Sequence, residues 1–222
     1  MTVEVLDWRA RQPNPPKLVR GKKKHRLDAH GLVVVRNIGD IDSITVHQTA
    51  CTFGKAKGDP DRYHRAFGVA CHALAFSDRR VVLPNPLLWH VNHGNGFNAR
   101  ALGLEIEGRF PGLKGKPGTL ASTPETPVTE DLVETAREAL RQLVELGRGL
   151  GMPIRYAHAH RQSSPTRRSD PGEELWRRVV LEYGVPELGL VTQPQLVLLT
   201  GRPPEPGRPI PLAWDPQGVG KY

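Results

Sequence analysis

Cysteine is scarce in this chain, which has only Cys51 and Cys71 among its 222 residues. Two cysteines cannot build the disulfide scaffold of a small secreted domain, and no CxxC pair is present to suggest a thiolate zinc site. We interpret the two residues as separate buried thiols. One bridge between them is the alternative that their spacing leaves open.

Long apolar runs are absent as well. No run is long enough to span a membrane, and the first residues, MTVEVLDWRARQPNPPK, lack the apolar core of a secretory signal. We therefore expect a protein without a membrane span that is made in the cytoplasm. Work outside the cell would then depend on release or injection by another route.

Aromatic residues make up only 6% of the chain, and 23 acidic residues face 31 Lys and Arg, which gives a net charge of +8. A basic chain favours anionic partners such as bacterial wall polymers, a lipid surface or nucleic acid, although a solvated basic face needs no partner. The basic residues do not alternate with aromatic ones as in nucleic-acid-binding proteins, so we expect no nucleic-acid partner.

The length suits one well-buried domain with extensions, and 21 prolines with 23 glycines indicate much loop. We predict an N-terminal extension over residues 1–40 that includes a first strand at 32–35, a core domain over 41–185 and a Pro-rich, extended tail over 186–222. The core pattern predicts strands at 44–47, 71–76, 80–83, 101–107 and 154–158, a long lid-like loop at 109–128, a helix capped by Thr129, and a last helix opened by Asp170.

The stretch AHAHRQSSPTRRSDPG, residues 157–172, carries a metal-binding pattern. It offers His160 and Asp170, and His47 at the end of the strand ITVH is the best candidate for a third ligand. Two histidines and one carboxylate suit zinc and leave a fourth position open for water, as in catalytic zinc sites. Single residues also have ordinary explanations, because Asp170 before a proline is a good helix N-cap and a lone histidine is usually structural.

Two carboxylates, Glu105 and Glu107, share one face of the predicted strand at 101–107, opposite an apolar face. Such a face is either functional or belongs to an edge strand whose outer side is solvated. The pattern alone leaves both interpretations open.

Four segments in order, ITVHQTA, GVACHALAFSDRRVV, WHVNHGNGFNARALGLEIEG and AHAHRQSSPTRRSDPG, carry a family resemblance. The tract NARALGLE is similar to Asn-x-Arg-Ser-Ile-Gly-Ile-Glu of the zinc-dependent N-acetylmuramoyl-L-alanine amidases. That superfamily also includes phage endolysins, a muropeptide-recycling amidase and the peptidoglycan-recognition proteins. The resemblance covers roughly residues 40–185 and implies an α/β (α+β) fold, a single domain whose central mixed β-sheet has helices on both faces.

Carried over position by position, the resemblance implies that His47, His160 and Asp170 bind Zn2+. It makes Glu105 the general base for the zinc-bound water. The implied activity is hydrolysis of the amide bond between N-acetylmuramic acid and L-alanine, either in the cell wall as by an antibacterial endolysin or in soluble muropeptides. We expect a monomer whose partner is this substrate.

The resemblance also implies roles for residues around the metal. Arg168 stands where many members have a lysine that stabilises the oxyanion. Trp89, His90 and Asn98 would line the substrate groove. Two alternatives are a non-catalytic peptidoglycan-recognition module and a zinc hydrolase of another amide. The presence of all three ligands and Glu105 disfavours the recognition module.

Overall fold

The computed structural model describes residues 2–13, 24–54, 60–112, 125–200, 204–220 and 222. Most of the lid-like loop predicted at 109–128 lies outside the described residues. Among the described helices, none has both the length and the apolar character needed to cross a lipid bilayer.

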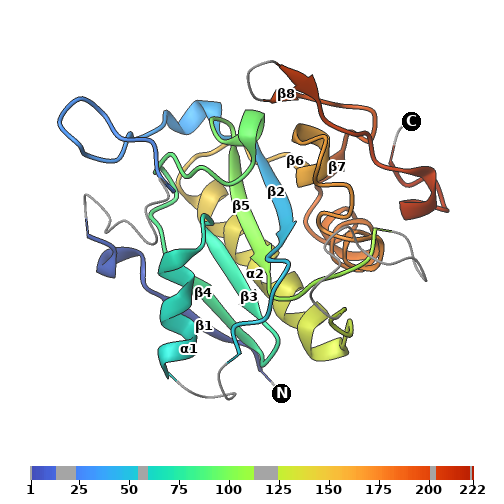
Figure 1. Cartoon of the computed structure of the whole chain (residues 1–222), viewed down its shortest axis with the longest axis horizontal. Coiled ribbons are helices and arrows are strands. Elements are labelled where there is room, and N and C mark those ends of the chain that lie inside the picture. The colour runs from blue at the N-terminus through green and yellow to red at the C-terminus, as the bar shows by residue number, and fades with distance from the viewer. Residues whose placement is uncertain (1, 14–23, 55–59, 113–124, 201–203, 221) are drawn as a thin grey trace.

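A seven-stranded mixed sheet forms the centre of the molecule (Figure 1). Its strand order is β1-β4-β3-β5-β2-β6-β7, and every neighbouring pair is parallel except the hairpin of β3 and β4. The strands are β1 (Glu4–Asp7), β2 (Ser43–Gln48), β3 (Ala73–Phe76), β4 (Arg80–Leu83), β5 (Ala101–Ile106), β6 (Tyr156–Ala159) and β7 (Val191–Thr192).

Side chains alternate between the two faces of this sheet. In β3, Ala75 joins the larger core cluster, whereas its neighbour Leu74 joins a smaller one. Successive side chains of a strand point to opposite faces, so the two clusters lie on opposite sides of the sheet. The larger cluster packs under α2 (Glu130–Gly149) and the smaller one under α1 (Pro60–His64) (Figure 1). Helices on both faces of a mixed sheet confirm the predicted fold class.

Helix α2 follows its sequence signals closely. The Oγ1 of Thr129 accepts a hydrogen bond from the N–H of Leu132 at 3.3 Å, so Thr129 is the predicted N-cap. Glu130 and Asp131 in the first turn complement the helix dipole. The buried face of α2 meets the sheet and the second long helical segment, which runs from α3 (Glu173–Leu175) into the π-helical stretch Trp176–Gly184.

The first strand is not the predicted one. Residues 32–35 make only isolated bridges, because Val33 faces Leu27 across a turn that Asp28 closes whereas Val35 faces Trp89, so the segment follows no single neighbour. Strand β1 instead lies near the start of the chain and pairs with β4 along all four of its residues.

The last helix begins at Glu173, three residues after the predicted start. Gly172 precedes it with a φ of 111°, a conformation that residues with a Cβ rarely adopt. The carboxylate of Asp170 caps no helix here. It faces His160 and the backbone of Gln48.

Among the described residues of 186–222, three short strands and a 3-10 turn interrupt the extended tail predicted from their prolines. Strand β7 extends the main sheet, and β8 (Leu199–Thr200) pairs with β9 (Glu205–Pro206). The side chain of Trp214 is fully buried in the larger core cluster, and the guanidinium of Arg161 lies 4.8 Å from its ring centre. The segment therefore packs against the turn that follows β6.

Candidate metal centre

Toward the carboxyl ends of the three adjacent central strands β2, β5 and β6, one face presents polar side chains or the backbone of a glycine. These positions lie on the side of the sheet away from α2, since their neighbours in sequence enter the larger core cluster. They are Thr45, His47, Gly103, Glu105 and His158. In the parallel pairing of β2 with β5, His47 stands opposite Glu105. Both residues lie near the carboxyl ends of their strands, and α/β sheets bind ligands at this end.

Three side chains converge at this edge. His47 comes from the end of β2, His160 from the turn after β6, and Asp170 from the loop before α3. One possible ligand atom of each lies within 4.8 Å of the other two, and all three residues are buried. The rings of His47 and His160 are 4.5 Å apart, and Nδ1 of His160 lies 2.9 Å from Oδ2 of Asp170. The structure thus brings together the three residues predicted as ligands.

The chemistry of this donor set fits a zinc ion. Nδ1 of His47 is buried and has no hydrogen-bond partner within the described part of the chain. Burial lowers the pKa of His47 well below its ordinary value, and the charges of His160, His93 and Arg167 lower it further. The ring is therefore neutral, as a ligand must be. Two imidazoles and one carboxylate are a donor set of catalytic zinc sites.

Gln48 holds the loop that carries Asp170. Its N–H donates to Oδ1 of Asp170 at 2.9 Å, and its side-chain nitrogen donates to the carbonyl of Pro171 at 3.2 Å. Its side-chain oxygen accepts from the N–H of Phe110 at 2.7 Å. The sequence did not single out Gln48, because its partner Asp170 lies 122 positions away and no short motif joins them.

Glu105 lies beside the ligand group without belonging to it. Its Oε2 is buried and has no hydrogen-bond partner among the described residues. Burial raises the pKa of Glu105 well above its ordinary value, the charge of Asp170 raises it further, and the charge of Arg167 opposes both. A carboxyl group with a raised pKa is suited to take up and release a proton near neutral pH.

The two arginines of the loop before Asp170 are both exposed. The carbonyl of Arg168, the predicted oxyanion residue, accepts a hydrogen bond from Arg161 at 2.5 Å. The charge of its neighbour Arg167 is the one that acts on the pKa values of His47 and Glu105. The sequence did not favour Arg167, because the resemblance aligns Arg168 with the lysine of the family.

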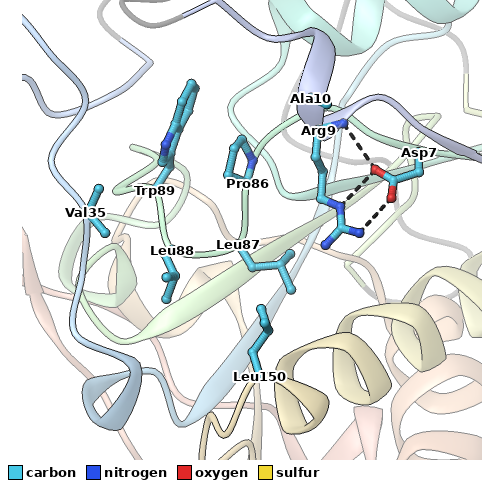
Figure 2. A pocket seen from close by; sticks show the side chains of 9 residues that line it. All are labelled: Asp7, Arg9, Ala10, Val35, Pro86, Leu87, Leu88, Trp89 and Leu150. Atoms are coloured by element: carbon cyan, nitrogen blue, oxygen red, sulfur yellow. Dashed lines mark hydrogen bonds and ion pairs between the residues drawn. The ribbon is translucent and has the colours of Figure 1, made fainter.

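Trp89 lines a cavity of about 520 Å³ together with Leu87 and Leu150 (Figure 2). The cavity also includes Asp7 at the carboxyl end of β1. Strand β1 runs parallel to β4, which is antiparallel to β3, and β3 is parallel to β5. The carboxyl end of β1 therefore lies at the end of the sheet opposite the candidate metal ligands. The structure therefore does not bring the Trp89 side chain to the metal centre.

His90 and Asn98 belong to the loop between β4 and β5. His90 is half-buried, and its Nδ1 has no partner among the described residues. The Oδ1 of Asn98 accepts a hydrogen bond from the N–H of Gly94 at 2.6 Å and so closes a turn of this loop. Contact of either residue with a substrate stays a prediction.

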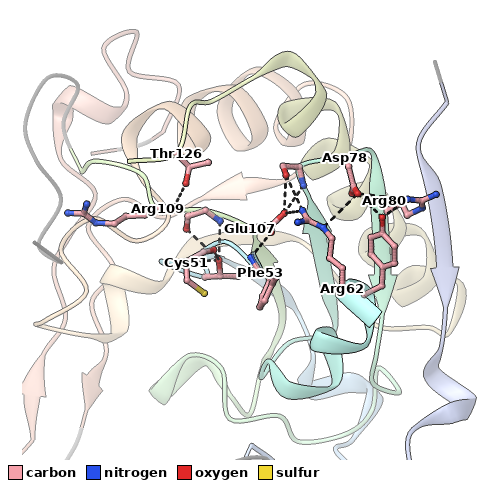
Figure 3. Close-up of polar contacts among 12 residues, drawn as sticks. Cys51, Phe53, Arg62, Asp78, Arg80, Glu107, Arg109 and Thr126 are labelled. Carbon is pink, nitrogen blue, oxygen red and sulfur yellow. Dashed lines mark hydrogen bonds and ion pairs between the residues drawn. The ribbon is translucent and has the colours of Figure 1, made fainter. Parts of the chain in front are cut away.

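Glu107 has a structural environment (Figure 3). It is fully buried, pairs with Arg62, and accepts hydrogen bonds from the N–H of Phe53 at 2.9 Å and from the N–H and Oγ of Ser77 at 3.0 Å. The solvated-edge interpretation of Glu105 and Glu107 is wrong, because β5 is the middle strand of the seven.

Both cysteines are free, which confirms the interpretation as separate thiols. Cys71 is buried as predicted, but Cys51 is exposed. Cys51 lies in the loop after β2, where its backbone bridges to Gly108 and leaves the residue at the surface.

Similar solved structures include the endolysin N-acetylmuramoyl-L-alanine amidase LysCS from Clostridium intestinale URNW, at 16% identity over 80% of this chain and 96% of that chain with a TM-score of 0.40. They also include the Ph2119 endolysin from Thermus scotoductus MAT2119 bacteriophage Ph2119, at 17% identity over 79% and 98% with a TM-score of 0.44. The Drosophila peptidoglycan recognition protein SD has 16% identity over 80% and 94% with a TM-score of 0.46.

A search of curated protein sequences found no match. The model of the N-acetylmuramoyl-L-alanine amidase family matches residues 37–173, more than half of the chain. This match includes His47, Glu105, His160 and Asp170. The chain belongs to the N-acetylmuramoyl-L-alanine amidase family.

Proposed function

We propose that the protein is a zinc-dependent amidase that hydrolyses the bond between N-acetylmuramic acid and L-alanine in peptidoglycan or its soluble fragments. The observation that carries the proposal is the position of Glu105, with its unpartnered Oε2, directly opposite His47 in the sheet. Family membership supports the substrate class, and the net charge of +8 favours anionic wall polymers.

His47, His160 and Asp170 would hold the zinc ion. When bound, zinc supplies a Lewis acid that polarises a carbonyl group and lowers the pKa of water. The buried N–H of Gln48 keeps Asp170 oriented toward the other two ligands.

Glu105 takes one proton from the attacking water as the water oxygen adds to the carbonyl carbon of the substrate. It then gives that proton to the amide nitrogen, and the bond between this nitrogen and the carbonyl carbon breaks. The products are a carboxylate on the muramic acid side and a stem peptide with a free amine on L-alanine. The raised pKa of Glu105 suits a group that must hold this proton between the two transfers.

The oxyanion that forms on the carbonyl oxygen needs a positive partner. Arg168 is the residue predicted for this role, and Arg167 is a second candidate because its charge acts on Glu105. Comparison of Arg167→Gln with Arg168→Gln distinguishes them, since only the arginine that stabilises the oxyanion lowers kcat on removal.

The test is digestion of purified sacculi and of soluble anhydro-muropeptides by zinc-loaded protein, with products identified by mass spectrometry. Stem peptides that begin at L-alanine are the expected products. Glu105→Gln should lower the rate by about 10²- to 10⁴-fold and still bind zinc. Glu134→Gln, on the exposed side of α2, is the matched control and should remain active. A wild-type protein that binds zinc but leaves both substrates intact would contradict the proposal and favour peptidoglycan recognition without cleavage.

A further inference from the structure

A buried histidine lies directly behind one of the metal-ligand candidates. His93, in the loop that leads into β5, is 6% exposed. Its ring stands at 87° to the ring of His47, with 5.2 Å between the centres. Its Nδ1 is 3.0 Å from Nε2 of His47, and its Nε2 is 3.1 Å from the carbonyl oxygen of Ala101.

These two contacts determine where the protons of both rings lie. A carbonyl oxygen only accepts hydrogen bonds, so Nε2 of His93 carries a proton and donates a hydrogen bond to the carbonyl of Ala101. A neutral imidazole then has its lone pair on Nδ1, which accepts from Nε2–H of His47. The lone pair of His47 is consequently on Nδ1, the buried atom without a partner among the described residues.

The strand next to His93 leaves room for its ring. A Cβ placed on Gly103 would lie 2.7 Å from Cγ and 3.0 Å from Nδ1 of His93, closer than such atoms approach. A glycine inside a strand often marks a close approach of this kind. Gly103 is the one sequence signal that could have drawn attention to His93.

We propose that His93 is a positioning residue for the metal ligand His47. By accepting a hydrogen bond from Nε2–H of His47, His93 fixes both the tautomer and the orientation of the His47 ring and leaves Nδ1 for the metal. The inference rests on the proposed zinc site. Ligating histidines commonly donate their second N–H to a carboxylate, a carbonyl or water. Here the acceptor is the neutral imidazole of His93, and Nε2–H of that ring in turn donates to the carbonyl of Ala101.

The first test measures zinc affinity by competition with a chelator. His93→Leu keeps most of the buried volume but removes the acceptor, and should weaken zinc binding by about 10- to 100-fold. His93→Asn places an amide oxygen near the position of Nδ1 and should restore most of the affinity. His25→Leu is the matched control, because His25 is also buried but pairs with Asn85 rather than with a ligand.

Two outcomes of this comparison would overturn the proposal. Zinc binding by His93→Leu that equals the wild type would remove any role for the acceptor. Equally weakened zinc binding in His93→Leu and His25→Leu would show that the effect comes from a general loss of packing.

The second test needs no metal and therefore separates this inference from the proposed function. In the metal-free protein with 15N-labelled histidine, NMR should show the proton of His47 on Nε2, hydrogen-bonded to Nδ1 of His93. This result would uphold the positioning contact even if the wild type bound no zinc, in which case only the proposed function would fail. A proton on Nδ1 of His47 would overturn the inference whatever the zinc measurement gives.

Discussion

Two glutamates, one in β5 and one directly after it, show how strongly local surroundings divide the roles of identical side chains. Glu107 accepts hydrogen bonds from two loops and pairs with Arg62. Glu105, two residues earlier, has a buried oxygen without a partner among the described residues. A buried polar atom that lacks a partner is costly in a folded protein and requires an explanation, which a catalytic role would supply for Glu105. The satisfied glutamate is thus the structural one.

Glu107→Ala should lower the free energy of unfolding by about 3–5 kcal/mol, because it leaves the guanidinium of Arg62 buried without its main carboxylate. Urea unfolding monitored by tryptophan fluorescence measures this loss. The exposed pair of Glu4 with Arg80 is the control, and Glu4→Ala should cost less than about 1 kcal/mol. Losses of the same small size in both variants would show that the buried pair is not structural.

His158 predicts a dependence of stability on pH. Burial is the main cause that lowers its pKa from 6.5 to about 3, and its ring stacks on Phe97 at 4.6 Å. Because the unfolded chain binds the proton first, this contribution to stability is complete above about pH 6.5 and is lost progressively as the pH falls toward 3.

In His158→Phe this loss should disappear. For metal-free protein, the unfolding free energy should fall less steeply below about pH 6 than in the wild type, by about 1 kcal/mol per pH unit. Chemical unfolding at several pH values gives the two slopes. Identical slopes would mean that His158 takes up its proton equally in the folded and unfolded chains.

At the scale of the element, β5 and the residue that follows it carry three groups with different roles. Gly103 and Glu105 lie in β5 and Glu107 comes directly after it, so the three stand at every second position and point to the same side. Gly103 leaves space for the ring of His93, and Glu105 lies opposite His47. Glu107 accepts hydrogen bonds from two loops. A strand in the middle of the sheet holds these groups in fixed register, as a loop would not.

Gly103→Ala tests this arrangement. The added methyl group would lie 2.7 Å from Cγ of His93, so the ring must move. We expect a loss of about 1–3 kcal/mol in unfolding free energy, typical of overpacking, and weaker zinc binding. Gly149→Ala, at the end of α2 where nothing lies within 4 Å of the new atom, is the control and should keep full stability. Wild-type zinc affinity in Gly103→Ala would contradict the close contact.

At the scale of the whole molecule, the C-terminal segment is part of the structure around the metal centre. The N–H of Leu198 donates to the carbonyl of Gln162 at 2.8 Å, and the N–H of Arg208 donates to the carbonyl of Arg161 at 2.7 Å. Both acceptors follow His160 directly. The segment therefore supports the turn that holds this ligand.

Trp214→Ala should consequently behave as a core mutation, with a loss of about 3–5 kcal/mol, because the side chain is fully buried. Leu212 lies two residues away in the same turn but is 68% exposed. Leu212→Ala should therefore change the free energy of unfolding by less than about 0.5 kcal/mol. Thermal unfolding of the two variants separates them. A tail that merely lies on the surface would give two small effects.

Local signals in the sequence predicted the elements that depend on them, and distant contacts escaped prediction. The cap and apolar spacing of α2 and the hairpin of β3 and β4 need only neighbouring residues. The residue pattern suggested His47, His160 and Asp170 as ligands, and the family resemblance implied the same set. The contact of His93 with His47 spans 46 positions, and the prolines near the C-terminus gave no sign that Trp214 enters the core. Composition describes a segment but not what the segment packs against.

The separation of the ligands along the chain has a consequence for folding. Gln48 and Asp170 meet across 122 positions, and β2 acquires its two neighbours, β5 and β6, only through long crossovers. Contacts that close such long loops form late and slowly. The proposed metal ion would therefore not nucleate the fold, because these long crossovers separate the elements that carry its three candidate ligands. If metal binds at the proposed site, its binding should appear late in a refolding experiment.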